Sequence, residues 1–431
     1  MRVLFVVPPL VGHVNPTIAV AAELTARGHR VAWTGPAAAL SPLLPPGSVL
    51  YPAGDPGGGE EGTDALHGRW RDLRGVAALR FLWAEVLLPL ARAMLPGVHA
   101  AVEDFAPDVV VADQQALAGP LVARRHGLPW ATSATTSAEF ADPFDGVPKV
   151  GEWVAQRIAA LLAQCGAPSG WDPRFSPHLV LVFSTPALIG GGGPAGHGAR
   201  PAADLGGTAP AALAPPPHYA FVGPAFGARP SAGDFPWHRL DPGRARVLVS
   251  LGTLNREAGT RFYPAVLRAA DALADRAQLI LAAPREFAGD VPPHLIHQEY
   301  VPQLALLPHL DAVLCHGGHN TVCEALAHGL PLVVAPVRDD QPIVAGQVAA
   351  SGAGVRVRFG RARADELHRA LAAVLDDPAH RRAARRIQAS FAAAGGARTA
   401  ADRLEKLSAG ATGRAAPPVP GTAPTENEKG P

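Results

Sequence analysis

The chain has 431 residues, of which 17% are charged and 48% hydrophobic, with 38 Lys and Arg against 37 Asp and Glu. This length suffices for two or three domains with buried cores, and the composition excludes a highly charged disordered chain and a protein built of membrane spans. The formal net charge of +1 provides no basic excess for nucleic acid. Three cysteines without a CxxC pair exclude a disulfide framework or a structural zinc as organising principle, and favour a reducing compartment.

Neither a membrane span nor a signal peptide is predicted from the apolar segments. The longest apolar stretch with helical character, residues 76–95, is interrupted by three charged residues and is expected to be amphipathic. The apolar N-terminus is cut short by Pro8 and Pro9, and no small-residue cleavage site follows. We therefore expect a cytoplasmic protein without stable membrane insertion.

The first 35 residues predict a strand, a helix and a second strand. Residues 3–7 form a short apolar run bounded by prolines, which indicates a buried strand, and a loop that holds His13 follows. Asn15 is expected to cap the helix, and Gly28 is expected to end it before a strand over residues 31–34. A βαβ unit implies a parallel sheet with helices on both faces.

The alternation of strands and helices continues through two halves of similar size that join near residue 230. Residues 187–217, rich in Gly, Ala and Pro, are expected to form a long flexible loop, and the Pro-rich tail from residue 409 is expected to be disordered. The further strands expected are 108–112, 129–132, 247–251, 278–282, 312–315, 331–335 and 354–357, with a helix over 116–126.

A glycine pair stands where the strand 312–315 gives way to a helix, in the run His316-Gly317-Gly318-His319-Asn320-Thr321. Glycines let a backbone approach a ligand closely, and the free N–H groups of a helix start favour an anion such as a pyrophosphate. Parallel α/β sheets bind ligands at the carboxyl ends of their strands. From the residues alone, either an anion site or a tight turn that requires glycine fits this run.

Further polar side chains follow neighbouring strands of the same half. Each one alone fits a loop or a helix cap, whereas together they predict one rim with an anion cradle, a carboxylate for hydroxyl groups and an acid–amide pair. These residues are Ser250 and Thr253, Glu324, and Asp340 with Gln341.

At this point the sequence resembles a known family. The chain shares the nucleotide-sugar signature of the inverting GT-B glycosyltransferases of family 1, which include antibiotic and natural-product enzymes and the UDP-glycosyltransferases of plants and animals. The runs that carry the resemblance are Tyr300-Val301-Pro302-Gln303, His316-Gly317-Gly318, Asn320-Thr321, Glu324-Ala325-Leu326, Gly329-Leu330-Pro331 and Asp340-Gln341, with Gly12-His13-Val14-Asn15-Pro16 and Phe221-Val222-Gly223-Pro224 in the first half.

The resemblance implies a GT-B fold, with two Rossmann-like domains that face each other across a cleft. Residues 1–225 would bind the acceptor, 226–243 would be a linker, and 244–395 would bind the nucleotide sugar. A helix over 396–408 would cross back to the first domain, and 409–431 would be a disordered tail.

The resemblance also implies roles for individual residues. The chain departs from the common pattern with Tyr300 where many members have tryptophan, with His319 in place of glycine or tryptophan, and with Val344 in place of asparagine. The implied roles are donor diphosphate binding by Ser250, Thr253, His316, Gly317, Gly318, Asn320 and Thr321, base and ribose binding by Tyr300, Val301, Gln303 and Glu324, and sugar binding by Asp340 and Gln341.

His13 is the candidate general base and Asp113 the carboxylate that orients it. A neutral imidazole at the mouth of the cleft can take the proton of an acceptor hydroxyl, and the positive end of the first helix is expected to keep the imidazole neutral. Asp113, at the end of its strand, would stabilise the imidazolium that forms. From the residues alone, His13 also fits a loop residue and Asp113 a helix cap.

The expected reaction moves a sugar from a UDP- or TDP-sugar to a hydroxyl of a small apolar natural product (a polyketide, macrolide or aromatic aglycone), without metal or cofactor. Trp83, Trp153 and Trp171 either line the acceptor pocket or belong to the core. Two other functions stay open: a nucleotide-sugar epimerase or hydrolase on the same fold, and a non-catalytic sugar-nucleotide-binding partner protein. The sequence carries no indication of oligomeric state.

Overall fold

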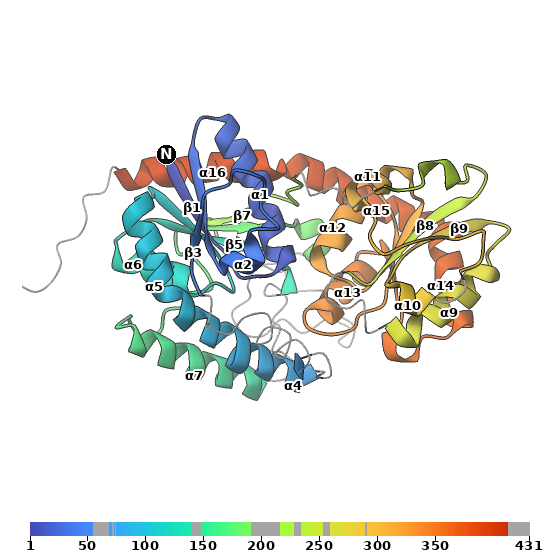
Figure 1. Cartoon of the computed structure of the whole chain (residues 1–431), viewed down its shortest axis with the longest axis horizontal. Coiled ribbons are helices and arrows are strands. Elements are labelled where there is room, and N and C mark those ends of the chain that lie inside the picture. The colour runs from blue at the N-terminus through green and yellow to red at the C-terminus, as the bar shows by residue number, and fades with distance from the viewer. Residues whose placement is uncertain are drawn as a thin grey trace, which may run out of the picture.

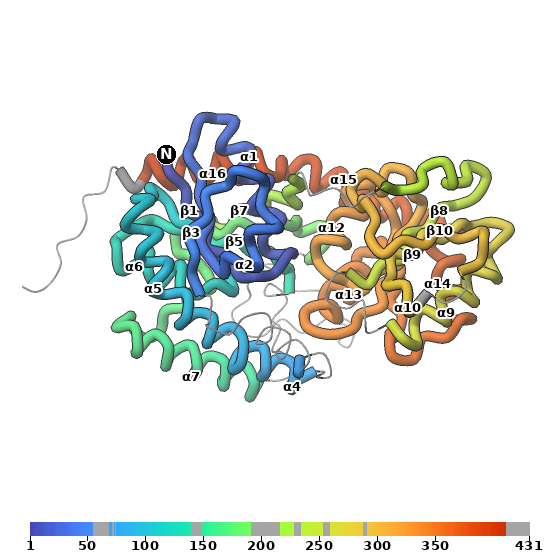
Figure 2. Tube along the Cα trace, in the orientation of Figure 1, coloured from blue at the N-terminus to red at the C-terminus, as the bar shows by residue number. Residues whose placement is uncertain are grey.

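The computed structural model describes residues 1–54, 69–70, 73, 75–138, 148–190, 216–227, 234–252, 259–288 and 291–412. Two parallel β-sheets form the two halves of an elongated molecule, and helices cover both faces of each sheet (Figure 1). Figure 2 shows the chain building the first half, crossing once to the second, and returning at its C-terminal end. The predicted α/β architecture of two Rossmann-like halves is confirmed.

The first sheet has seven parallel strands in the order β3-β2-β1-β4-β5-β6-β7. The interior strand Arg2–Val6 is buried on both faces, because Val3 and Phe5 belong to one hydrophobic cluster and Leu4 and Val6 to the opposite one. The strands are β1 (Arg2–Val6), β2 (Arg30–Gly35), β3 (Leu50–Pro52), β4 (Val109–Asp113), β5 (Trp130–Ala134), β6 (Leu179–Val182) and β7 (Tyr219–Phe221).

Helices cover the two faces of this sheet. A π-helical turn, η1, lies between α4 and α5; such turns are rare and often mark functional sites. The helices of this half are α1 (Val11–Ala26), α2 (Ala37–Leu40), α4 (Gly75–Phe81), η1 (Leu82–Leu87), α5 (Leu88–Phe105), α6 (Ala118–Arg125), α7 (Pro148–Gln164) and α8 (Pro186–Ile189).

One continuous helical run, Gly75–Phe105, is by length and composition alone apolar enough to cross a membrane. Core helices of soluble proteins pass the same test, so this is weak evidence for a span. Met94, Val98 and Ala101 of this run are buried against the first sheet.

The second sheet has six parallel strands in the order β10-β9-β8-β11-β12-β13. Val247 and Val249 belong to the hydrophobic cluster on one face and Leu248 to the cluster on the other, as in the first sheet. The strands are β8 (Ala245–Ser250), β9 (Ala277–Ala282), β10 (Ile296–Gln298), β11 (Ala312–Cys315), β12 (Leu332–Val334) and β13 (Gly354–Arg356).

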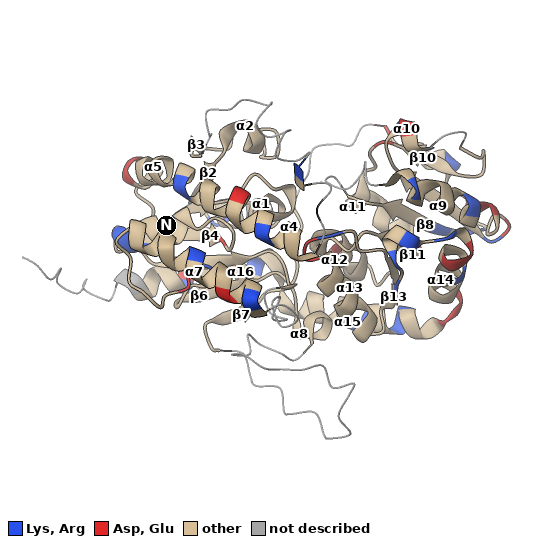
Figure 3. Ribbon diagram, turned by 90° about the horizontal axis from the view of Figure 1, so that it is seen from below, with Lys and Arg blue, Asp and Glu red and all other residues tan. Residues whose placement is uncertain are grey.

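The helices of the second half include two that begin at the cleft, α12 and α13. Charged residues of both signs occur on both halves of the ribbon (Figure 3). The helical elements are η3 (Trp237–Arg239), α9 (Phe262–Asp271), α10 (Arg285–Ala288), α11 (Gln303–Leu306), η5 (Leu307–His309), α12 (His319–Ala327), α13 (Gln341–Ala350), η6 (Phe359–Arg361), α14 (Ala364–Asp376), α15 (Pro378–Ala394) and α16 (Gly396–Thr412).

The last helix, α16, lies along α1 of the first half (Figure 1). Leu404 is fully buried in the cluster that α1 shares with the first sheet. Arg27 Nη1 pairs with Asp402 at 2.6 Å and with Glu405 at 3.0 Å. The chain therefore returns to the half where it began, and this return ties the two halves together.

The structure differs from the sequence expectations at several boundaries. Helix α1 begins at Val11, so His13 lies in its first turn and not in a loop, and Asn15 does not cap it. Helix α16 runs to Thr412, beyond the expected end at 408. Strands β3, β6, β7 and β10 were not expected, and α8 lies at the start of the segment 187–217. Most of that expected loop (191–215) and of the tail (413–431) lies outside the described residues, and the domain limits 1–225, 226–243 and 244–395 stay predictions.

Candidate functional site

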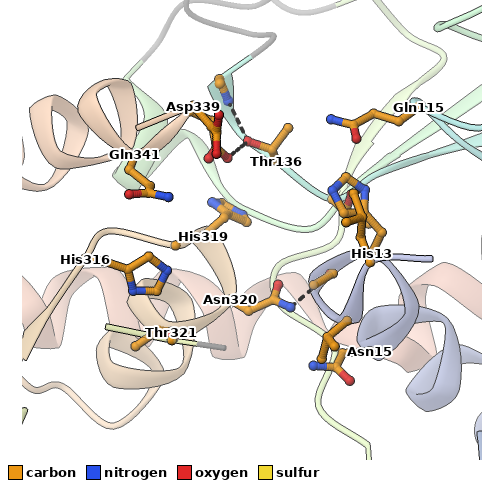
Figure 4. Close-up of a pocket in the computed structure, with 18 of the residues that line it drawn as sticks. His13, Asn15, Gln115, Thr136, His316, His319, Asn320, Thr321, Asp339 and Gln341 are labelled. Atoms are coloured by element: carbon orange, nitrogen blue, oxygen red, sulfur yellow. Dashed lines mark hydrogen bonds between the residues drawn. The ribbon is translucent and has the colours of Figure 1, made fainter. Parts of the chain in front are cut away.

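A cavity of about 440 Å³ lies between the carboxyl ends of the two sheets, and both halves contribute to its lining. The first half supplies the start of α1 and the loops after β4 and β5, and the second supplies the loops after β8, β11 and β12. Figure 4 shows side chains from both halves facing one another across it. This is where open α/β sheets place their ligands.

His13 and Asp113 form a hydrogen-bonded pair at the edge of this cavity. His13 Nδ1 lies 3.0 Å from both Asp113 oxygens, its side chain is 15% exposed, and that of Asp113 is fully buried. The backbone N–H of Gln115 donates to Asp113 Oδ1 at 2.9 Å, and the Thr135 hydroxyl donates to Oδ2 at 2.9 Å. Asp113 is therefore held from three sides, with His13 Nδ1 as the donor that faces it.

The charge of Asp113 sets the protonation of His13. Burial of the imidazole favours its neutral form, but the negative charge of Asp113 and the hydrogen bond to it, with a contribution from Asp340, outweigh burial and raise the pKa of His13. The expectation that the positive end of the first helix keeps the imidazole neutral is therefore wrong, because the pKa of His13 is raised and Asp113 is the main cause that raises it. A raised pKa makes the neutral imidazole a stronger base toward the proton of an acceptor hydroxyl.

The turn between β11 and α12 is built around the imidazole of His316. Gly317 has φ +89°, and a Cβ on Gly318 would stand 2.5 Å from His316 Nε2, so both positions require glycine. Gly252, with φ +69°, approaches the same ring from the loop after β8. Burial lowers the pKa of His316 to about 4, so the ring is neutral at pH 7.

The same turn leaves polar groups available to an anion. Gly318 is the N-cap of α12 and no side chain caps the helix, so the first N–H groups of α12 point toward the cavity end. His316 Nδ1 is buried without a hydrogen-bond partner in the described part of the chain. Ser250, Gly318 and Thr321 line the cavity beside it. The arrangement can hold a diphosphate through backbone N–H groups and one neutral imidazole.

Asn320 connects the two halves. Its Nδ2 donates to the carbonyl oxygen of Gly12 at 2.9 Å (Figure 4). Pro16, four residues after Gly12 in α1, has no N–H and therefore cannot supply the usual helical donor to this carbonyl. The side chain of Asn320 provides it from the opposite half.

A second set of contacts crosses the cleft through the loop after β5. Thr136 Oγ1 donates to Asp340 Oδ2 at 2.6 Å, and Ser137 Oγ donates to Gln347 Oε1 at 2.5 Å. His319 lies between the halves, 3.3 Å from the Phe183 carbonyl oxygen and from Ser137 Oγ. Hydrogen bonds that use Asp340 and Asn320 thus bridge the two halves across the cleft.

The remaining predicted residues of the second half lie on the same rim. Gln303 Nε2 donates to Glu324 Oε2 at 2.5 Å, and Glu324 is 1% exposed, so Gln303 lines the cavity with Glu324 behind it. Tyr300 is 59% exposed at the outer end of the cavity beside Val301. Gln341 Oε1 accepts from the backbone N–H groups of residues 337 and 338, which leaves its amide nitrogen to face the cavity.

Matches to known proteins cover most of the chain. Residues 269–407 match the family described as Erythromycin biosynthesis protein CIII-like, C-terminal domain. The chain is 32% identical to 4'-demethylrebeccamycin synthase of Lentzea aerocolonigenes, over 94% of this chain and 99% of that protein, and 30% identical to the oleandomycin glycosyltransferase of Streptomyces antibioticus, over 91% and 88%. The solved structure of the glycotransferase of kitacinnamycin matches with a TM-score of 0.71 at 27% identity, over 94% of this chain and 98% of that one.

The chain belongs to the family 1 glycosyltransferases of the antibiotic type. The GT-B fold that the resemblance implied is confirmed. In this glycosyltransferase the predicted site residues His13, Ser250, Tyr300, Val301, Gln303, His316, Gly318, Asn320, Thr321, Asp340 and Gln341 line one cavity. Asp113 and Glu324 lie behind it as buried partners, Gly317 shapes the turn, and Thr253 lies outside the described residues.

Most of the residues that the first half adds to the cavity were not predicted from the sequence. The π-helical turn places Leu82, Trp83 and Leu87 on its wall. Trp83 lines the cavity and is also buried in a hydrophobic cluster of the glycosyltransferase, whereas Trp153 and Trp171 are partly buried against that cluster and do not line the cavity. Trp70, Gln114, Gln115, Thr135, Thr136 and Arg174 also line it. Gln114 and Thr135 directly follow a strand, and this position is the only signal that could have indicated them. The other residues of this set follow no motif.

Proposed function

We propose that this glycosyltransferase moves a sugar from a UDP- or TDP-sugar to a hydroxyl group of a small apolar natural product, with inversion at the anomeric carbon. The observation that carries the proposal is that the His13–Asp113 pair and the N-terminal turn of α12 open into one cavity. One side can activate a hydroxyl, and the other can hold a leaving diphosphate.

The reaction needs one proton transfer and one displacement. His13 Nε2 takes the proton of the acceptor hydroxyl, while Nδ1–H stays bonded to Asp113 and the charge of the imidazolium is balanced by that carboxylate. The acceptor oxygen forms its bond to the anomeric carbon as the bond from that carbon to the diphosphate oxygen breaks. Attack on the face opposite the diphosphate inverts the configuration.

The leaving diphosphate gains negative charge in the transition state. The first N–H groups of α12, His316 and Thr321 are placed to stabilise it, with Ser250 alongside. Gln303 and Glu324 are proposed to bind the ribose, with Tyr300 and Val301 at the base. Asp340 and Gln341 would bind sugar hydroxyls, which requires Thr136 to release Asp340 when the donor enters.

Neither a metal nor a cofactor is part of the proposal. The stretches that the structure describes contain no group of three His, Cys, Asp or Glu side chains that could hold a metal ion. The negative charge of the leaving group would be stabilised instead by the N–H groups at the start of α12 and by neutral hydrogen-bond donors. We also propose a cytoplasmic location, with no nucleic acid or membrane as partner.

The acceptor is proposed to be an apolar molecule, since Leu79, Leu82, Trp83 and Leu87 line the first-half side of the cavity. The names of the relatives agree with this, because rebeccamycin and oleandomycin stand in the names of the enzymes cited above.

The test incubates the protein with UDP- or TDP-α-D-glucose and a panel of phenolic and macrolide alcohols, and determines the anomeric configuration of each product by NMR. A β-glucoside is expected, with a His13→Ala variant at least 100-fold slower and an exposed-site control, His238→Ala, unchanged. An α-glucoside, or full activity in His13→Ala, would contradict the mechanism. Hydrolysed or epimerised donor without alcohol would favour the alternative enzymes.

A further inference from the structure

Gln114 is buried at the cavity with its side-chain amide unused. It directly follows Asp113 at the end of β4, is 2% exposed, and lines the cavity. Its backbone N–H donates to the Ser133 carbonyl oxygen at 3.2 Å. Within the described part of the chain, however, neither Oε1 nor Nε2 of Gln114 has a hydrogen-bond partner. The neighbouring Gln115 Oε1 is buried and unpartnered as well.

A buried amide without partners opposes folding, because both its carbonyl and its NH₂ group lose the water that they bind in the unfolded chain. An apolar side chain of similar length would avoid that loss. A ligand that completes the hydrogen bonds of the Gln114 amide would remove this cost.

The surroundings leave that task to a bound molecule. The π-helical turn contributes Leu82, Trp83 and Leu87 to the lining; the two leucines offer no hydrogen-bonding group, and no hydrogen bond joins the Trp83 indole N–H to Gln114 in the described part of the chain. Arg174, also on the lining, donates from Nη2 to Asp172 Oδ2 at 2.8 Å and from Nε to Oδ1 at 3.0 Å. Gln114 and Gln115 thus add unpartnered amide atoms to a lining that the π-helical turn makes partly apolar, and Gln114 lies one residue from the carboxylate that holds His13.

We propose that Gln114 recognises a second polar group of the acceptor, one that presents an N–H donor and a carbonyl acceptor side by side, as a lactam, imide or carboxamide does. A planar side-chain amide offers the complementary pair, since Oε1 accepts and Nε2 donates on the same edge. The acceptor is then an apolar molecule with a hydroxyl at His13 and an amide-type edge at Gln114. This inference rests on the proposed function only in naming the ligand as the acceptor.

The test compares three bicyclic probes of nearly equal shape by calorimetric titration in the presence of TDP. The lactam 7-hydroxy-2-quinolone offers both groups, the lactone 7-hydroxycoumarin lacks the N–H, and 2-naphthol lacks both. The wild-type protein is expected to bind the quinolone about tenfold more tightly than the coumarin, because the lactone oxygen leaves Gln114 Oε1 unpaired. Gln114→Met keeps the side-chain length and is expected to bind quinolone and coumarin within twofold of each other.

Two further readouts separate recognition from structure. Thermal unfolding of Gln114→Met is expected at or above the wild-type temperature, since no internal hydrogen bond is lost. The control Gln164→Met changes a glutamine that bonds to Arg92 on α5 and does not line the cavity, and it is expected to keep the tenfold preference.

Equal affinity of the wild-type protein for quinolone and coumarin, including binding of neither, would overturn the proposal. So would a preference that survives in Gln114→Met, or a lowered unfolding temperature of that variant. No sugar transfer is needed for the titration. A lactam preference without transfer would count against the proposed function alone, and transfer without the preference would count against the role of Gln114 alone.

Discussion

Replacing Asp113 with asparagine should reverse the tautomer of His13 while preserving the shape of the site. Asp113 accepts hydrogen bonds from His13 Nδ1, from the Gln115 N–H and from the Thr135 hydroxyl. Asparagine has one carbonyl oxygen and one NH₂ group in place of the two carboxylate oxygens. With its oxygen on the Gln115 N–H, its NH₂ group faces His13 Nδ1, which must then accept. The proton of the imidazole moves to Nε2, the atom that should receive the proton of the acceptor.

The size of the effect follows from what is lost. General-base catalysis contributes about 10²–10⁴-fold, or about 3–5 kcal/mol, and all of it depends on an unprotonated Nε2. The loss of the negative charge also removes the main influence that raises the pKa of His13, and burial then lowers it. We therefore expect kcat of Asp113→Asn to fall by 10²–10⁴-fold, while the acid limb of the kcat/KM profile moves to lower pH.

The assay is the pH dependence of transfer under saturating donor, with Asp108→Asn as a matched control. Asp108 accepts from the backbone N–H of Arg2 at 2.6 Å and does not line the cavity, so this control should keep the wild-type profile. An Asp113→Asn enzyme within fivefold of wild-type kcat, with an unmoved acid limb, would refute the role of Asp113.

Three further predictions concern the donor side. Gly318→Ala should weaken TDP or UDP binding at least tenfold, because its Cβ would stand 2.5 Å from His316 Nε2. The control Gly346→Ala, whose Cβ would meet nothing within 4 Å, should bind the nucleotide normally. Equal titration curves for the two variants would contradict this prediction. The pKa of His316 is about 4 in the folded protein and 6.5 in the unfolded chain. About 3 kcal/mol of the stability that is present above pH 6.5 is therefore lost as the pH falls toward 4. The unfolding free energy of His316→Asn should fall less steeply over that window than that of the wild type. Transfer should persist in excess EDTA, and activity that vanishes and returns with Mg²⁺ would exclude a metal-independent reaction.

Much of the fold could be predicted because its central strands are apolar on both faces. β1, β4, β8 and β11 are continuous apolar runs, and their prediction agrees with the structure to within two residues at either end. The edge strands β3, β7 and β10 are only three residues long, and so short a run does not by itself separate a strand from a loop. β12 and β13 are equally short but were predicted as the longer runs 331–335 and 354–357. β6 carries a clear apolar run and could have been assigned.

The start of α1 shows how a contact between distant residues overrides a local signal. Asn15 and Pro16 read as N-cap and first helical residue, since proline loses nothing there. The helix nevertheless begins at Val11, because Asn320 supplies the donor that Pro16 cannot give to the Gly12 carbonyl. That donor comes from 308 residues away in the chain, and no local pattern reveals it.

The donor side of the candidate site could be predicted from the sequence to a larger extent than the acceptor side. The glycine turn after β11 and the acid–amide pair before α13 follow strands, so their place at the carboxyl edge could be predicted. On the acceptor side only Trp83 was a candidate, one of three tryptophans, because Trp70, Trp83 and Gln114 reach the cavity from separate elements of the first half. The hydrogen bond from Thr136 to Asp340 depends on how the two halves meet, which composition and periodicity do not specify.

Nucleotide binding tests the donor site most directly, since it needs no knowledge of the acceptor. Thermal unfolding is measured without ligand and with saturating UDP, TDP, GDP or NAD. A nucleotide at about a hundred times its dissociation constant stabilises the folded state by about 2.7 kcal/mol, which a melting curve resolves. We expect a raised unfolding temperature with UDP or TDP. No shift with either would contradict a donor site at the start of α12 and favour a protein that kept the fold without the chemistry.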